Sequence, residues 1–330
     1  VPFCAGRCRY CDFFSVRVRA GLVAPVIAAI EREIAAREAR LSPETVYLGG
    51  GTPTALPPGH LQALLAAVGR HVDLARVREF TVEANPGTLS PEKVEILRAS
   101  GVHRVSLGAQ SFDPAILERM RRPHTADETR AAFALLRRAG FSNLGLDLIF
   151  AYPGQTLPGW ERDLGEAAAL KPEHVSAYAL SLGEGTPLAR DVAAGRLALP
   201  GEEAVRAMYG AAMDLLPRAG LRQYEISNYA RAGFESRHNL LGWRGEDYLG
   251  VGPGAVSTVE GRRFKNPESL RDYLRRSARG AGPAEEEVLD PPTRAREKIM
   301  LGLRTAEGVS EEDLASLGVA PAALAPLRDL

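Results

Sequence analysis

The chain has 330 residues, of which 45% are hydrophobic and 25% are charged, a composition typical of a globular protein. This length allows a sizeable core and two domains. The 41 basic and 41 acidic residues cancel, which argues against nucleic acid as a partner. No run of eighteen or more apolar residues occurs, so no transmembrane segment is expected.

The three cysteines of the chain, Cys4, Cys8 and Cys11, form a C-x3-C-x2-C pattern. An odd count argues against a disulfide framework, and thiolates suit zinc or iron–sulfur clusters. A structural zinc site takes four protein ligands, and a four-iron cluster normally takes four cysteines. Three thiolates on four irons would leave one iron open to a small ligand that carries an amine and a carboxylate. Reduced cysteines of this kind fit a cytoplasmic protein.

Predicted strands and helices alternate after the cysteines. Strands are predicted at 45–48, 79–83, 103–108, 144–150 and 174–180. Helices are predicted at 22–40, around 61–68, after Ser90, from a Thr125–Glu128 capping box to Gly140, and at 157–170. Such alternation indicates βαβ units and a parallel sheet. The chain starts only three residues before Cys4, so we expect that it is trimmed there and that a first strand lies upstream. Six strands would make an α/β fold of the partial (β/α)6 TIM-like barrel type.

The pattern changes beyond about residue 185. Helices near 202–219 and 267–279 flank an irregular stretch at 223–258, and 281–293 has the composition of a linker. A helical segment at 294–330 stops without a visible end, so the chain is expected to be trimmed there too. The sequence therefore predicts a barrel core at 1–185 and a smaller, mixed, mainly helical domain at 186–330.

Polar motifs follow the predicted strands at their carboxyl ends, where parallel barrels place their active sites. The run Gly49–Pro53 would let backbone approach a ligand, unless it is a plain turn. Glu83 would accept two hydroxyl hydrogen bonds, or lie solvated at a strand end. Arg122 would bind a carboxylate, or reflect the preference of a helix end for cations. Asp147 stands between two leucines, which is unusual for an acid without a partner.

The cysteine pattern resembles the signature of the radical S-adenosylmethionine (SAM) superfamily, in which three cysteines hold a [4Fe-4S] cluster and SAM chelates the fourth iron. More motifs resemble the oxygen-independent coproporphyrinogen III oxidases and their relatives. The matching stretches are 1–4, 49–53, 83–86, 106–112, 147–149, 153–155, 223–228, 236–239 and 248–250. The resemblance implies SAM contacts at Tyr10, Gly50, Gly51, Thr52, Glu83, Gln110, Arg122 and Asp147.

Two positions separate the branches of that family. The oxidase branch has a further cysteine two residues after the third one, where this chain has Phe13. This resembles the heme chaperone branch, called HemW in bacteria, which carries an H-N-x-x-Y-W motif associated with heme. Here the motif reads His238-Asn239-Leu240-Leu241-Gly242-Trp243, with Gly242 in place of Tyr. His238 is a candidate heme ligand, and the alternative is a structural histidine bonded to backbone.

Three functions stay open at this stage. The first is a heme chaperone, built on a radical SAM barrel, that passes heme to an acceptor protein such as a respiratory membrane enzyme. It would act in the cytoplasm or peripherally at the membrane. The second is SAM-dependent oxidative decarboxylation of coproporphyrinogen III, in which the cofactors carry the chemistry. The third is a non-catalytic zinc or iron–sulfur module. No catalytic side chain is assigned.

Overall fold

A seven-stranded sheet with the order β3-β4-β5-β6-β7-β9-β8 forms the centre of the computed structural model, which describes residues 1–37, 42–280, 282–316 and 318. Five neighbouring strands run parallel. They are β3 (Thr45–Leu48), β4 (Glu79–Ala84), β5 (Arg104–Gln110), β6 (Leu144–Phe150) and β7 (His174–Ala179). These are the strands that the alternation predicts, so the parallel α/β architecture is confirmed.

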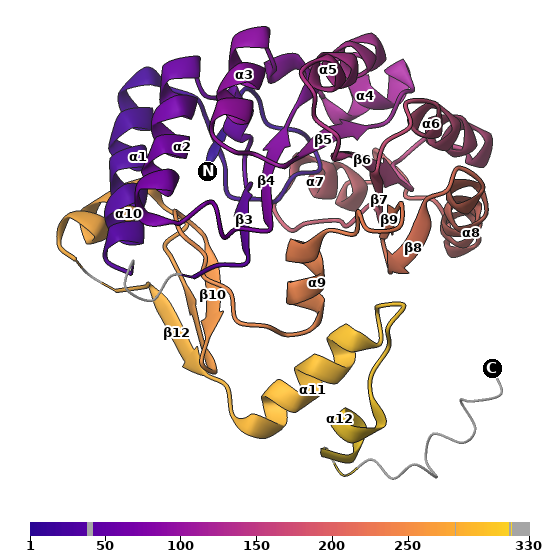
Figure 1. Cartoon of the computed structure of the whole chain (residues 1–330). Coiled ribbons are helices and arrows are strands. Elements are labelled where there is room, and N and C mark those ends of the chain that lie inside the picture. The colour runs from indigo at the N-terminus through magenta and orange to yellow at the C-terminus, as the bar shows by residue number, and fades with distance from the viewer. Residues whose placement is uncertain (38–41, 281, 317, 319–330) are drawn as a thin grey trace.

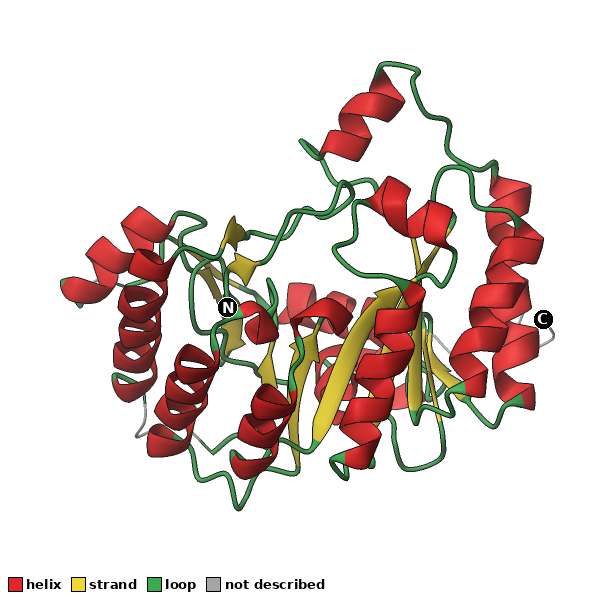
Figure 2. Cartoon of the chain, turned by 90° about the horizontal axis from the view of Figure 1, so that it is seen from above, coloured by secondary structure: helices red, strands yellow, loops and turns green. Residues whose placement is uncertain are grey.

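Helices cover the outer side of this curved sheet (Figures 1 and 2). Most of them bury their apolar sides in one continuous hydrophobic core, while the helices at 114–120 and 187–193 pack in a second, smaller cluster. The predicted Ser90 cap and the Thr125–Glu128 capping box are both present. The first helix ends at Ala35, short of the predicted residue 40, and residues 38–41 lie outside the described part. The helices are α1 (Ala20–Ala35), α2 (Pro58–His71), α3 (Pro91–Ala99), α4 (Pro114–Met120), α5 (Ala126–Arg138), α6 (Leu157–Ala169), α7 (Pro187–Ala193) and α8 (Glu202–Arg218).

A hairpin extends the sheet beyond the parallel strands. It consists of β8 (Arg222–Glu225) and β9 (Asn228–Ala230), and β9 pairs antiparallel with β7. The prediction of an irregular stretch at 223–258 is therefore wrong for these residues. The strands are too short and too polar to show a period of two in sequence, and β9 is stabilised by hydrogen bonds to β7. The division into domains at residue 185 stays a prediction.

The remaining elements include a small antiparallel sheet of β10 (Val256–Val259), β11 (Arg262–Lys265) and β12 (Glu285–Val288). The linker predicted at 281–293 is wrong, because its run of glutamates forms β12. Glu286 and Glu287 accept hydrogen bonds from Arg262 and Arg263 of the neighbouring strand, which explains why so charged a run is ordered.

Four helices accompany the small sheet, namely α9 (Arg237–Trp243), α10 (Leu270–Ala278), α11 (Pro291–Gly302) and α12 (Glu311–Ser316). The helical segment predicted at 294–330 is thus two helices where it is described, and 317 and 319–330 lie outside the described part.

The cysteine loop is tied to the carboxyl end of β3. Its ends form the short parallel pair β1 (Phe3–Cys4) and β2 (Val16–Arg17). The carbonyl oxygens of Val1 and Phe3 accept hydrogen bonds from the N–H groups of Gly51 and Thr52, both at 2.7 Å. Because Gly51 and Thr52 lie in the turn that follows β3, these bonds place the cysteines at the edge where the parallel strands end.

Candidate functional site

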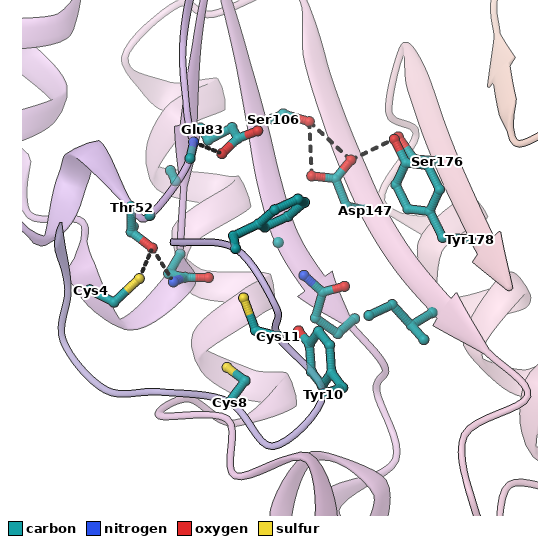
Figure 3. A pocket seen from close by; sticks show the side chains of 18 of the residues that line it. Cys4, Cys8, Tyr10, Cys11, Thr52, Glu83, Ser106, Asp147, Ser176 and Tyr178 are labelled. Atoms are coloured by element: carbon teal, nitrogen blue, oxygen red, sulfur yellow. Dashed lines mark hydrogen bonds between the residues drawn. The ribbon is translucent and has the colours of Figure 1, made fainter. Parts of the chain in front are cut away.

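A cavity of about 420 Å³ lies between the cysteine loop and the parallel strands, and Figure 3 shows part of its lining. All three cysteines and all eight residues predicted to contact SAM line it. These residues are far apart in sequence, so the fold brings them together. His238 is not among the lining residues, although its neighbours Ser236 and Asn239 are. The roles of these residues remain predictions.

The three cysteine sulfurs face a common space (Figure 3). Cys4 Sγ lies 3.7 Å from Thr52 Oγ1, and Cys8 Sγ accepts a hydrogen bond from Arg122 Nη1 at 3.4 Å. Among the described residues no three His, Cys, Asp or Glu side chains form a group that could hold a single metal ion. Three separate thiols around one space suit a four-iron cluster, in which each cysteine binds a different iron.

The glycine run after β3 packs mainly against the protein itself. A Cβ on Gly49 would lie 2.7 Å from the carboxyl carbon of Glu83, and one on Gly51 would lie 2.5 Å from the carbonyl oxygen of Phe3. Gly50 has a φ of 103° and donates its N–H to Glu83 Oε2 at 3.3 Å. The glycines are therefore required for close approach between the cysteine loop, this turn and Glu83.

Glu83 connects the glycine run with Tyr47. Tyr47 Oη donates to Glu83 Oε1 at 2.7 Å. Burial raises the pKa of Glu83 from its ordinary 4.5 to about 7, and the hydrogen bond from Tyr47 counteracts part of that rise. The carboxyl group is thus held at the cavity wall with a protonation state that changes near neutral pH.

Arg122 turns inward, away from the basic cluster that its sequence neighbours suggest. Arg121 closes α4 with a φ of 55°, which redirects the chain. Arg122 Nη2 then donates to the Gly108 carbonyl at 2.7 Å and to Asn85, while Nη1 lies 3.5 Å from Tyr10 Oη. The guanidinium is therefore fixed beside Cys8, where a carboxylate bound near the cysteines would meet it.

Asp147 has the partners that its apolar strand requires. Ser106 Oγ of β5 lies 3.0 Å from both of its carboxyl oxygens, and Ser176 Oγ of β7 donates to it at 2.8 Å (Figure 3). Burial raises the pKa of Asp147, and these two hydrogen bonds oppose the rise. Gln110, at a bulge in β5 with a φ of 66°, lines the same cavity.

His238 lies on α9, outside the cavity wall. Its Nδ1 is 2.9 Å from Thr45 Oγ1, and its ring stacks on Tyr47 with 4.8 Å between centroids. Burial lowers its pKa, which favours the neutral imidazole. Its ring thus bonds a threonine side chain instead of backbone. A Cβ on Gly242, which stands in place of the tyrosine of the motif, would meet nothing within 4 Å.

Sequence reasoning missed several polar residues of the cavity. Ser176 and Tyr178 of β7, with His174, face the same side of the strand, and Tyr47 projects from β3. The sequence pattern could have identified the residues of β7, because polar residues alternate with Val175 and Ala177 in the predicted strand. Nothing in the sequence marked Tyr47, since it lies in a short apolar strand.

Comparison with known proteins decides the family. The radical SAM superfamily matches residues 1–167. The heme chaperone HemW of Lactococcus lactis subsp. lactis is 39% identical over 316 residues, which cover 94% of this chain and 82% of that protein. HemW of Bacillus subtilis is 37% identical over 320 residues, 96% of this chain and 84% of that protein. The chain belongs to the radical SAM superfamily and, within it, to the HemW family.

Membership of the HemW family agrees with the fold. The structure of coproporphyrinogen III oxidase (HemN) from Escherichia coli, a radical SAM enzyme, matches with a TM-score of 0.84 and covers 100% of this chain and 82% of that chain. The two sequences are 20% identical, so this match shows the fold alone. The superfamily implies a [4Fe-4S] cluster and SAM. Within the described residues, none of the helices has the length and hydropathy of a membrane span.

Proposed function

We propose that this chain is a heme chaperone that binds a [4Fe-4S] cluster, SAM and heme and transfers the heme to an acceptor protein. The observation that carries the proposal is the identity of 35–39% with several HemW heme chaperones over almost the whole chain. Phe13 supports it, because the side chain at the position of the oxidase cysteine is apolar and 66% exposed at the cavity.

Cys4, Cys8 and Cys11 would hold the cluster, which supplies an open iron for SAM when both are bound. Arg122, beside Cys8, would bind the carboxylate of the methionine part. Glu83 would accept the ribose hydroxyls. The other contacts proposed for SAM are Tyr10, Gly50, Gly51, Thr52, Gln110 and Asp147.

His238 is the residue we propose for the heme iron. When Nδ1 donates to Thr45 Oγ1, the lone pair of Nε2 is available to a metal. Nε2 has no hydrogen bond within the described part of the chain, and stacking on Tyr47 fixes the plane of the ring. The acceptor is proposed to be a respiratory membrane enzyme, approached from the cytoplasm.

Hemin titration of the cluster-loaded protein tests the proposal. A Soret band should develop, and it should weaken in His238→Ala but not in His60→Ala, a histidine on the outer helix α2. Heme loaded on the wild-type protein should then pass to a heme-free acceptor. Absence of heme binding, together with vinyl formation from coproporphyrinogen III in the presence of SAM and dithionite, would instead establish the oxidase activity and overturn the proposal.

A further inference from the structure

The inner end of the cavity holds polar side chains that are not among the residues proposed to contact SAM. Arg104 at the start of β5 and His174 at the start of β7 both line the cavity and are only 2% and 1% exposed. Gly145 of the intervening strand β6 pairs with Ser106 and with His174. Asp147 lies two residues farther along β6 and therefore faces the same side. These residues form a layer beneath Asp147.

Arg104 is a buried cation that makes no direct ion pair within the described part of the chain. Its Nη1 donates to Asn143 Oδ1 at 3.3 Å and to the Phe234 carbonyl at 3.2 Å. No carboxylate oxygen of the described residues lies within ion-pair distance of the guanidinium. The charge of Arg104 favours the ionised form of Asp147, but no described carboxylate contacts the guanidinium directly, so it can still pair with an anion in the cavity.

His174 adds an unpaired donor at the same place. Its Nε2 lies 2.8 Å from Tyr224 Oη, which also accepts the N–H of Ser236 at 3.3 Å. Burial and the charge of Arg104 keep its pKa well below 6.5, so the ring is neutral. When Tyr224 donates to Nε2, the proton of the ring lies on Nδ1. That nitrogen is buried and has no partner among the described residues.

The bare face of Gly145 is where these groups converge. A Cβ on Gly145 would lie 3.2 Å from Ser106 Oγ, 3.3 Å from Arg104 Nη2 and 3.6 Å from His174 Nδ1. Ser106 donates its own proton to Asp147, which leaves Arg104 and His174 as the free donors. Two donors, one of them charged, that lie this close to a residue without a side chain suit one anionic oxygen.

We propose that Arg104, His174 and the bare face of Gly145 form a carboxylate subsite, which takes a propionate-type side chain of an organic ligand other than SAM. A single positive charge matches a monoanion, and the nearby carboxyl group of Asp147 opposes a second negative charge. The same cavity continues from this subsite past Asp147 to the cysteines. Identifying the ligand as a tetrapyrrole rests on the proposed function, whereas the carboxylate chemistry does not.

The test compares hemin with hemin dimethyl ester, which lacks the free carboxylates, on the cluster-loaded, SAM-bound protein. Wild type should bind hemin about tenfold or more tightly than the ester. Arg104→Gln and Gly145→Ala should each lower the affinity for hemin to that for the ester. Neither substitution should change the affinity for the ester. Gly145→Ala fills the site without removing the charge, so it remains informative if Arg104→Gln folds poorly. Gly165→Ala, which adds a methyl group where nothing lies within 4 Å, is the matched control.

Equal affinity of wild type for hemin and ester, or a preference that survives in both variants, would overturn the subsite and leave the chaperone proposal intact. If neither compound binds, the proposed function fails, and crystals soaked in 3-bromopropionate decide the subsite alone. An anomalous bromine peak beside Gly145 in wild type that is missing in Gly145→Ala supports it. Only water at that position overturns it.

Discussion

The carboxyl group of Glu83 lies among groups that act on its pKa in opposite directions. Burial raises the pKa to about 7, while the hydrogen bonds from Tyr47 and from the Gly50 N–H favour the ionised form. Only the ionised carboxylate lets both oxygens accept further hydrogen bonds from ribose hydroxyls in addition to these two. A change of pH near neutrality is therefore expected to change the affinity for SAM.

We expect the affinity of wild type for SAM to rise about tenfold between pH 6 and pH 8, since the carboxylate fraction rises by about that factor around a pKa of about 7. Glu83→Gln should bind SAM more weakly and lose this pH dependence. Isothermal titration calorimetry at both pH values measures this. Glu161→Gln, an exposed position on α6, is the control and should behave like wild type. A pH dependence that persists in Glu83→Gln would assign it to another group.

Cys8 is the most buried of the three cysteines, with 8% of its surface exposed. Cys8→Ala leaves two thiolates, which is too few for a stable four-iron cluster. The iron content measured after anaerobic reconstitution should fall from about four irons per chain to well below that number. Phe13→Ala changes an exposed side chain of the same loop and should retain the iron. A full, SAM-responsive cluster in Cys8→Ala would contradict the ligand assignment.

At the scale of elements, α9 is positioned by a carboxylate from the sheet. Glu79, at the start of β4, is 4% exposed and accepts hydrogen bonds from Ser236 Oγ and from the N–H groups of Arg237 and His238 at 3.1–3.3 Å. These bonds satisfy the amino end of the helix. They also hold His238 against Tyr47, so a residue of β4 determines where the candidate heme ligand lies.

Glu79→Gln should lower the free energy of unfolding by about 1–3 kcal/mol. The substitution replaces one acceptor oxygen by an amide nitrogen, which cannot accept hydrogen bonds from the buried donors of α9. It should also weaken hemin binding, since α9 carries His238. Chemical denaturation and the Soret titration measure the two effects. Glu92→Gln, an exposed residue in the first turn of α3, should change neither. If Glu79→Gln is destabilised but binds hemin as wild type does, the position of α9 does not determine heme binding, contrary to this prediction.

The five parallel strands were predictable because they are short runs rich in apolar residues that alternate with amphipathic helices. The cavity residues at strand ends were predictable for the same reason, since parallel strands end at one edge. The inward turn of Arg122 was not, because it depends on the left-handed conformation of Arg121. The pairing of Asp147 with two serines depends on strand register, which a sequence pattern does not specify.

At the scale of the molecule, α1 joins the parallel sheet to the elements that follow α9. Figure 1 shows α10 beside α1. Glu33 of α1 accepts hydrogen bonds from Tyr273 Oη at 2.7 Å, Asn266 Nδ2 at 2.8 Å and the Gly252 N–H at 3.0 Å. These three donors are more than 200 residues away in sequence, so one carboxylate fixes much of the later chain to the barrel.

Glu33→Ala should therefore loosen residues 250–278 selectively. Removing the carboxylate leaves three donors without their acceptor, at a cost of about 2–3 kcal/mol or more. Hydrogen exchange followed by mass spectrometry should show faster exchange in 250–278 and in the part of α1 that faces them, while β4, β5 and β6 exchange as in wild type. The control is Glu31→Ala, also on α1, which removes an exposed ion pair with Arg70 of α2. It should leave the exchange rates of 250–278 unchanged. Equal acceleration across the central sheet would show that the later elements and the barrel open as one cooperative unit, contrary to this prediction.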